Sequence, residues 1–316
     1  MKRAKEKYHN LNNVTKAYLQ LHLCVFLWGF TAILGKLISV AALSLVWWRV
    51  AFTTLSLLFV KRLFSKIREI PRRKVGIYMF IGILVCTHWV LFYASIKASN
   101  ASVGVLCMAL SPIFTAFIEP LYFRRRVLWF EILLSLVVIP GMYLVTQNIS
   151  ASMITGLVYG IFSALFASWF STLNKKYIEH SDPVAITFLE LGSAWIFLSV
   201  IMLVSAAAGM DFSFIPKEND WLYLILLSVA CTAIPYVLSL MSLKYISVFA
   251  TNLTINLEPV YGIFLAWILL QEDKEVDSGF YLGVLIILAS VFSYPFSVPT
   301  GQFLRPHPSK TVLRQY

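Results

Sequence analysis

Ten apolar runs follow one another along this chain, separated by short loops. A helix needs about 20 consecutive apolar residues to cross the hydrocarbon core of a bilayer, and each run is close to this length. Hydrophobic residues make up 59% of the chain and charged residues 13%, against about 25% charged residues in soluble domains. The sequence therefore predicts an all-α integral membrane protein with ten transmembrane helices: Ala17–Val40, Ser44–Val60, Val75–Ile96, Ala101–Phe123, Leu128–Thr146, Met153–Leu173, Val184–Gly209, Trp221–Leu243, Val248–Leu270 and Gly279–Ser297.

The lysine and arginine residues indicate how the chain is oriented in the membrane. A net charge of +11 would indicate a nucleic-acid partner if the basic residues formed one soluble face. They lie instead in short loops between the apolar runs, and cytoplasmic loops are the ones that carry an excess of lysine and arginine. With the N-terminus inside, most of the 26 basic residues fall in cytoplasmic segments. We therefore expect both termini in the cytoplasm and no nucleic-acid partner.

The chain contains an internal repeat. A shift of 147 residues aligns the segment that begins at Tyr93 with the one that begins at Leu240, so that Lys97 meets Lys244 and Pro112 meets Pro259. Each half then holds five helices, an odd number, so the second half must enter the membrane in the opposite direction. We expect two inverted five-helix repeats, residues 1–150 and residues 151–316, the second ending in a basic cytoplasmic tail.

Glu258 is the most unusual residue within an apolar run. A carboxylate near the centre of a spanning helix costs a few kcal/mol, so such residues mostly face a protein-lined cavity. Pro259 follows it and frees the carbonyl of Ile255, because proline has no N–H group to donate. Three roles remain open for Glu258: a proton carrier, a counter-charge for an amine or cationic substrate, or a neutral acid that is hydrogen-bonded in the packing.

Small, polar and aromatic side chains share helix faces that point toward the same predicted cavity. Such stripes also allow membrane helices to pack closely, and that alternative applies to each stripe. The charged residues Lys36 and Arg49 are expected to extend from outer helix ends to the interface, with a substrate carboxylate as the alternative partner of Arg49, and Glu190 is expected to be structural. The candidate substrate-binding residues are Glu258, His88, Trp28, Thr31, Tyr93, Ser111, Ser163, Trp169, Tyr236, Ser239, Thr251 and Asn256.

Catalytic and metal-binding signatures are missing from the sequence. It has no HExxH, GxSxG or GxxxxGK[ST] motif, and its five aspartates fall in the predicted loops. The four cysteines lie inside apolar runs without CxxC spacing. We expect no enzymatic activity, no cofactor, no metal site and no ATP-driven step.

The sequence resembles the EamA branch of the drug/metabolite transporter superfamily over nearly its whole length. The resemblance is carried by LWGFTAILGK in the first run, VWWRVAF in the second, LSPIF in the fourth, and LEPVYGIFLAWILLQE and GVLIILASV in the last two. The chain departs from the family where a Gly-Glu pair often closes the fourth helix, since it has Phe123 followed by three arginines. The resemblance implies a secondary carrier, commonly an exporter of amino acids or other small metabolites, with a central cavity between its halves.

Residues and resemblance together predict a secondary active transporter that exports a small metabolite, such as an amino acid or a related amine or drug. We expect alternating access in a bacterial inner membrane, with protons as a candidate coupling ion and no required oligomer. One alternative is a nucleotide-sugar carrier, which would need basic residues deep in the cavity to hold phosphates; the candidates are Lys36, Arg49, Lys97 and Lys244, all placed near helix ends. The other alternative is a receptor or scaffold that transports nothing.

Overall fold

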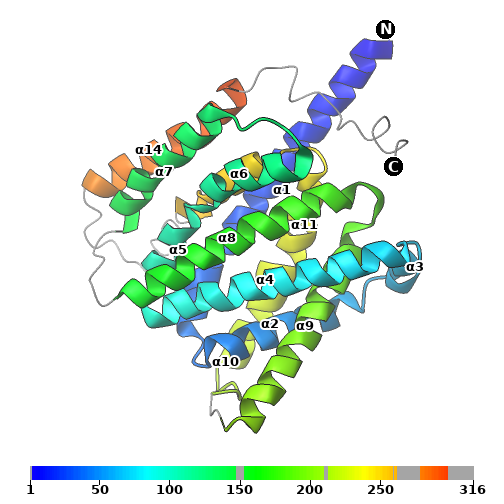
Figure 1. Ribbon diagram of the computed structural model, residues 1–316, viewed down its shortest axis with the longest axis vertical. Helices are drawn as coiled ribbons and strands as arrows, with labels where there is room; N and C mark the ends of the chain where they lie inside the picture. The colour runs from blue at the N-terminus through cyan, green and yellow to red at the C-terminus, as the bar shows by residue number, and fades with distance from the viewer. Residues whose placement is uncertain (1, 147–152, 210–212, 259, 262–277, 298–316) are drawn as a thin grey trace.

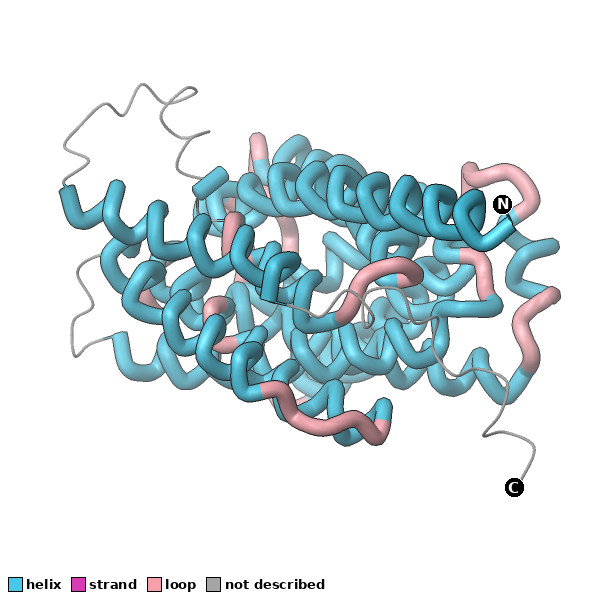
Figure 2. The backbone as a smooth tube through the Cα atoms, turned by 90° about the horizontal axis from the view of Figure 1, so that it is seen from above, coloured by secondary structure: helices cyan, strands magenta, loops and turns pink. Residues whose placement is uncertain are grey.

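The chain folds into a bundle of helices joined by loops (Figures 1 and 2). The computed structural model describes residues 2–146, 153–209, 213–258, 260–261 and 278–297. The helices are α1 (Lys2–Leu37), α2 (Ala42–Leu57), α3 (Leu63–Arg68), α4 (Arg72–Ala98), α5 (Ala101–Met108), α6 (Ser111–Phe123), α7 (Trp129–Thr146), α8 (Ile154–Tyr177), the short η2 (Ile178–His180), α9 (Pro183–Ala207), α10 (Asp220–Ser228), the π-helical η3 (Val229–Ala233), α11 (Ile234–Leu243), α12 (Val248–Ile255) and α14 (Ser278–Ser297).

The helical segments confirm a multi-pass membrane protein. Among the described residues, six segments are long and apolar enough to cross a membrane, and three shorter apolar helices accompany them: Ala42–Leu57, Trp129–Leu144 and Tyr281–Tyr294. Of the predicted run Val248–Leu270, helix α12 covers Val248–Ile255, while Pro259 and residues 262–270 lie outside the described residues. The count of ten transmembrane helices and the cytoplasmic location of both termini therefore stay predictions.

Three predicted elements differ from the structure. Helix α1 begins at Lys2, so the basic segment before the first apolar run continues the helix. The basic loop after α2 contains the short helix α3. The run predicted as one helix over Ala101–Phe123 is two helices, α5 and α6, because Pro112 lacks the N–H group that would continue the α-helical hydrogen bonds.

The break between α5 and α6 recurs at the end of α12. The 147-residue shift carries the bounds of α5 onto those of α12. At the first break the N–H of Ala109 donates to the carbonyl of Leu106 (3.0 Å), and at the second the N–H of Asn256 donates to the carbonyl of Leu253 (3.2 Å). Both are bonds over three residues, which tighten a helix end into a 3₁₀ turn. The two segments thus share their backbone geometry.

The N-termini of these two short helices are also capped in the same way. The side chain of Asn100 accepts a hydrogen bond from the N–H of Val103 (2.9 Å), and the hydroxyl of Ser247 accepts one from the N–H of Ala250 (3.1 Å). Each cap satisfies an N–H group that has no partner within the helix. The same shift relates the two caps, so the repeat extends from sequence to local structure.

The long helices pack around a centre formed by both halves of the chain. Helix α4 packs along α8 and α9, α1 packs along α11, and α7 and α14 lie side by side at one edge of the bundle (Figure 1). A Cβ atom added to Gly82 of α4 would lie 2.0 Å from the carbonyl oxygen of Glu190 in α9. Only glycine allows the backbones of α4 and α9 to approach this closely.

Substitution of Gly82 by alanine should separate α4 from α9 and lower the midpoint of thermal unfolding in detergent. Overpacking of this kind typically costs about 1–3 kcal/mol. Gly76, on the same helix, is the matched control, because a Cβ atom there has no described neighbour within 4 Å. Equal midpoints for Gly82→Ala and Gly76→Ala would contradict the close contact between the two helices.

Candidate functional site

A cavity lies where α1, α2, α4, α5 and α6 of the first half face α8, α11 and α12 of the second. Its wall is mainly apolar and aromatic, with a few polar and charged side chains, which is typical of small-molecule sites. Eight of the predicted site residues line it: Glu258, His88, Trp28, Thr31, Ser111, Tyr236, Ser239 and Thr251. The geometry brings these side chains together, while their role in binding a substrate stays a prediction.

Two of the predicted site residues lie behind the cavity wall and support residues that line it. Tyr93 is fully buried, and its hydroxyl accepts a hydrogen bond from Nη1 of Arg49 (3.0 Å). Ser163 is also fully buried, and Nδ1 of His88 lies 2.9 Å from its carbonyl oxygen and 2.8 Å from its hydroxyl. A carbonyl oxygen accepts hydrogen bonds only, so Nδ1 of His88 carries a proton.

Two further predicted site residues do not line the cavity. Trp169 donates from Nε1 to the hydroxyl of Tyr122 (2.8 Å) and stacks on Phe166, which turns the indole away from the cavity. Asn256 lies in the turn that ends α12, where its side chain is buried in the packing.

The expectation that Arg49 extends to an outer interface is wrong. Arg49 lies in the middle of α2, is only 2% exposed and lines the cavity. Its Nε donates to Oγ1 of Thr232 (2.7 Å), and its guanidinium carbon lies 3.9 Å from the ring centre of Trp89. These contacts replace part of the hydration that a buried arginine loses. The sequence contained a signal for this position, because a charged residue inside an apolar run indicates a functional site.

The π-helical segment η3 positions the partner of Arg49. In this wider turn the hydroxyl of Thr232 donates to the carbonyl of Leu227, five residues earlier (2.6 Å), and its oxygen accepts from Arg49. The carbonyl of Ser228 accepts a hydrogen bond from the hydroxyl of Thr53 on α2 (3.0 Å). π-Helical turns often occur at functional sites, and this one joins α2 of the first half to the second half at the cavity.

Glu258 faces the same cavity from the second half. Oε1 accepts a hydrogen bond from the hydroxyl of Thr31 on α1 (3.3 Å), and Thr31 and Trp28 lie beside it on the wall. Within the described residues neither Glu258 nor Arg49 forms a salt bridge. The cavity therefore presents a cation and a carboxyl group at separate places on its wall.

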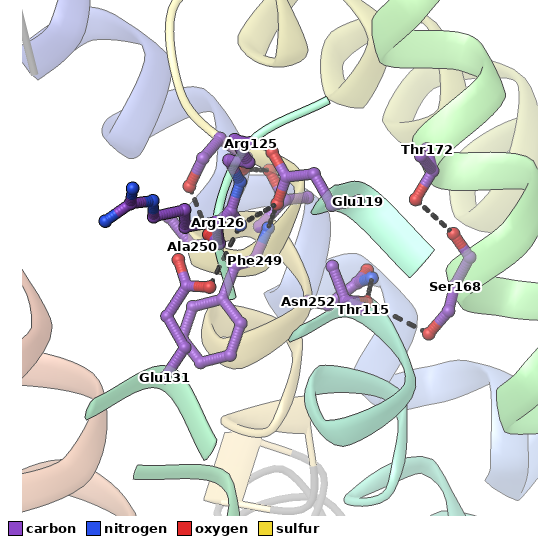
Figure 3. Close-up of polar contacts among 12 residues, drawn as sticks. Thr115, Glu119, Arg125, Arg126, Glu131, Ser168, Thr172, Phe249, Ala250 and Asn252 are labelled. Carbon is purple, nitrogen blue, oxygen red and sulfur yellow. Dashed lines mark hydrogen bonds and ion pairs between the residues drawn. The ribbon is translucent and has the colours of Figure 1, made fainter. Parts of the chain in front are cut away.

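Other polar residues on the wall were not among the predicted site residues. Asn174 of α8 and Asn252 of α12 both line the cavity. Nδ2 of Asn252 donates to Oγ1 of Thr115 (2.7 Å), and the hydroxyl of Thr115 lies 2.9 Å from that of Ser168 (Figure 3). This chain of hydrogen bonds joins α12 of the second half to α6 of the first.

A charged cluster of two buried carboxylates and a partly exposed arginine lies near the other end of α6, shown in Figure 3. Nη2 of Arg125 lies 3.1 Å from Oε2 of Glu119 and 2.9 Å from Oε2 of Glu131. Glu119 also accepts a hydrogen bond from the N–H of Phe249 in the first turn of α12 (3.2 Å), where the helix dipole favours a negative charge. We refer to Glu119, Arg125, Glu131 and the Phe249 N–H as the α6–α12 cluster.

No described residues form a metal site, since the described part of the chain contains no group of three or more histidine, cysteine, aspartate or glutamate side chains that could hold an ion. What the arrangement can do is bind a small molecule through charge pairing, hydrogen bonds and aromatic contact. The hydroxyl of Ser163, which contacts Nδ1 of His88, is fully buried behind the cavity wall and is not among the residues that line the cavity.

Comparison with known proteins identifies relatives along nearly the full chain. The model of the EamA-like transporter family matches twice, over residues 15–147 and 154–295. The chain is 24% identical over 274 residues to a protein of Archaeoglobus fulgidus named "Uncharacterized transporter", which covers 84% of this chain and 95% of that protein. It is 21% identical over 231 residues to "Uncharacterized transporter YxxF" of Bacillus subtilis, covering 72% of this chain and 71% of that protein.

A solved structure shares the fold. It is a crystal structure titled "Crystal structure of protein", and it superposes with a TM-score of 0.70 at 13% sequence identity, over 88% of this chain and 95% of the other. At this identity the similarity shows the arrangement of the helices. The two matches of the family model fall on either side of residues 148–153, so each covers one of the halves that enclose the cavity.

Cysteine substitution should distinguish the cavity wall from the packing behind it. Ser171 lines the cavity, whereas Ser168, three residues earlier on α8, is fully buried and bonded to Ser111. A small water-soluble thiol reagent should therefore modify Ser171→Cys and leave Ser168→Cys unmodified, as measured by mass spectrometry. The native cysteines are buried and give a low background. Equal modification of both variants would contradict a water-accessible cavity at this position.

Proposed function

The chain belongs to the EamA-like transporter family, and on this premise we propose that it is a secondary active transporter that exports a small metabolite across a bacterial inner membrane. The substrate class that the cavity fits best is an amino acid or a related amine. The proposed architecture is ten transmembrane helices in two inverted repeats, residues 1–150 and 151–316, with both termini in the cytoplasm. The repeated backbone geometry of α5 and α12 supports this division.

The observation that carries the substrate assignment is the pair of opposite charges on the cavity wall. The hydrogen bonds of Arg49 to described residues use Nε and Nη1, which leaves Nη2 for a ligand. Guanidinium groups bind carboxylates through parallel N–H bonds, and the carboxylate of Glu258 pairs with an ammonium group. A zwitterion matches both. The aromatic side chains Trp28 and Trp89 on the wall suit the apolar part of such a molecule.

Alternating access requires contacts between the halves that break in turn. The α6–α12 cluster is one such contact, since Glu119 of the first half binds the N-terminus of α12. A second contact lies at the end of α1, where the N–H and hydroxyl of Ser39 donate to the carboxylate of Asp220 (2.9 and 2.6 Å). In the proposed topology the first contact is cytoplasmic and the second is external. We assign them as the inner and outer gates.

A nucleotide-sugar carrier remains the second candidate, and the position of Arg49 favours it more than the sequence did. The sequence argued against a nucleotide-sugar carrier because all candidate basic residues were placed near helix ends and none deep in the cavity. One arginine faces the cavity, but Glu258 lies on the same wall and would repel a diphosphate. The combination of one cation with one acid therefore fits a zwitterion better than a polyanion.

A ligand screen with purified protein tests the substrate class. Amino acids, amines and nucleobases should be added separately, and molecules that carry both an ammonium and a carboxylate group should raise the midpoint of thermal unfolding.

In Glu258→Gln the affinity for these zwitterionic molecules should fall about 10- to 150-fold, because a hydrogen bond to a charged group contributes about 1.5–3 kcal/mol. The exposed Glu179 supplies the matched control variant, Glu179→Gln. Unchanged affinity in Glu258→Gln would remove Glu258 from the site, and an unchanged pH dependence of transport would exclude it as a proton carrier.

Substitution of Arg125 by glutamine tests the inner gate. Loss of one partner from a buried ion pair typically costs about 3–5 kcal/mol, so the variant should unfold at a lower temperature and should open more readily to the cytoplasm. The second effect should appear as faster modification of Ser171→Cys from the cytoplasmic side. Arg126→Gln is the control, since the side chain of Arg126 is exposed. Identical stability and labelling of the two variants would contradict a gate at the α6–α12 cluster.

A further inference from the structure

Glu190 of α9 is a fully buried carboxyl group directly behind the cavity wall. Its Oε2 accepts hydrogen bonds from the hydroxyl of Tyr236 (2.5 Å) and from Nδ2 of Asn174 (3.3 Å). Its Oε1 has no hydrogen-bond partner among the described residues. Both partners of Oε2 line the cavity, so this acid contacts the site without facing it.

The titratable groups that face this carboxyl group from α4 and α11 are neutral donors. They are the hydroxyl of Tyr78, which donates to the carbonyl of Tyr177 (2.8 Å), and the hydroxyl of Tyr236. His88, also on α4, is bonded to Ser163 instead. Of these two hydroxyl groups, that of Tyr236 donates to Glu190, and neither carries a positive charge.

The cations on the other helices around α9 are bound elsewhere. Arg49 of α2 is bonded to other side chains, as described above. Lys66 of α3 pairs with Asp182 at the start of α9 (2.9 Å), and Lys175 of α8 donates to the carbonyl of Leu243. Among the described residues, no cation forms a salt bridge with Glu190. Burial without a counter-charge is costly for an ionised carboxylate, and uptake of a proton removes that cost.

A continuous set of contacts leads from this acid to the arginine on the cavity wall. The ring of Tyr236 meets that of Trp89 edge-on, with centroids 6.1 Å apart at 75°. The guanidinium group of Arg49 lies on the ring of Trp89, at 3.9 Å. A movement of the Tyr236 side chain therefore displaces Trp89, which in turn contacts the guanidinium group of Arg49. We assign this guanidinium group to the binding of the substrate carboxylate.

We propose that Glu190 is a proton-binding site, separate from Glu258, that couples proton uptake to the shape of the substrate cavity through Tyr236 and Asn174. The coupling rests on the function proposed above, while the binding of the proton does not. The proton adds to Oε1, the oxygen without a described partner. The bond from Tyr236 then ends on a neutral oxygen, and hydrogen bonds to ionised groups are about twice as strong as those to neutral groups. Protonation thus releases Tyr236 toward the cavity, and deprotonation holds it against α9.

Infrared difference spectroscopy of the purified full-length protein, stepped from about pH 5 to about pH 9, tests the proton site directly. The C=O band of protonated carboxylic acids should lose intensity as the pH rises. This loss should be smaller in Glu190→Gln than in the wild type, and the part that Glu190→Gln removes should remain in Glu258→Gln. In Tyr236→Phe the band should persist to higher pH, because the ionised form has lost a donor. A wild-type spectrum that matches that of Glu190→Gln at every pH would overturn the proposal, since Glu190 would then hold one protonation state throughout.

A second measurement tests the link to the cavity. The rate at which a thiol reagent modifies Ser171→Cys should be measured against pH, with and without the additional Glu190→Gln substitution. The ratio of the two rates cancels the titration of the thiol itself, and it should change several-fold over the range in which the infrared band titrates. A constant ratio would overturn the coupling. A titrating band in a protein that binds no compound of the screen would instead support the proton site and count against the proposed substrate class.

Discussion

A guanidinium group inside an apolar bundle needs partners on several sides, and the helices around Arg49 are arranged to supply them. The π-helical turn η3 directs Thr232 at Nε, Tyr93 of α4 accepts from Nη1, and the ring of Trp89 covers one face. Without these contacts the loss of hydration would make the residue prohibitively costly at this depth. They hold a charge against the cavity wall in a fixed position, which is what recognition of a small charged ligand requires.

The internal repeat explains why the cavity lies between the halves. In each half a short helix ends in a tightened turn, at Met108 in the first and Ile255 in the second, and both of these residues line the cavity. Interrupted helices expose backbone polarity, which is tolerated at membrane depth only where it is buried in protein or lines a water-filled space. Polar contacts between the halves also occur outside the cavity wall, at Phe249 and at Asp220. In the proposed function, these two contacts are the gates of the substrate site.

The sequence predicted the helices well and the cavity in part, and the reason differs from residue to residue. Apolar length and helical periodicity placed Glu258 and His88 on the wall, because both depend on local pattern alone. The position of Arg49 depends on Trp89 and Tyr93 of α4 and on Thr232 of the π-helical turn η3, and no local pattern reveals these contacts. Trp169 was assigned to the wall by its chemical type, whereas its orientation follows from a hydrogen bond to Tyr122 on another helix.

A double-mutant cycle between Arg49→Gln and Glu258→Gln tests most directly whether the two charges are separate contacts to one ligand. Unfolding midpoints should be measured for the wild type, both single variants and the double variant, without ligand and with the best zwitterion from the screen. Separate ligand contacts predict nearly additive effects on stability without ligand, as found for groups that do not touch, and loss of ligand stabilisation in each single variant. Restoration of the wild-type midpoint by the double variant without ligand would contradict this, because it would show that Arg49 and Glu258 stabilise each other as a structural ion pair.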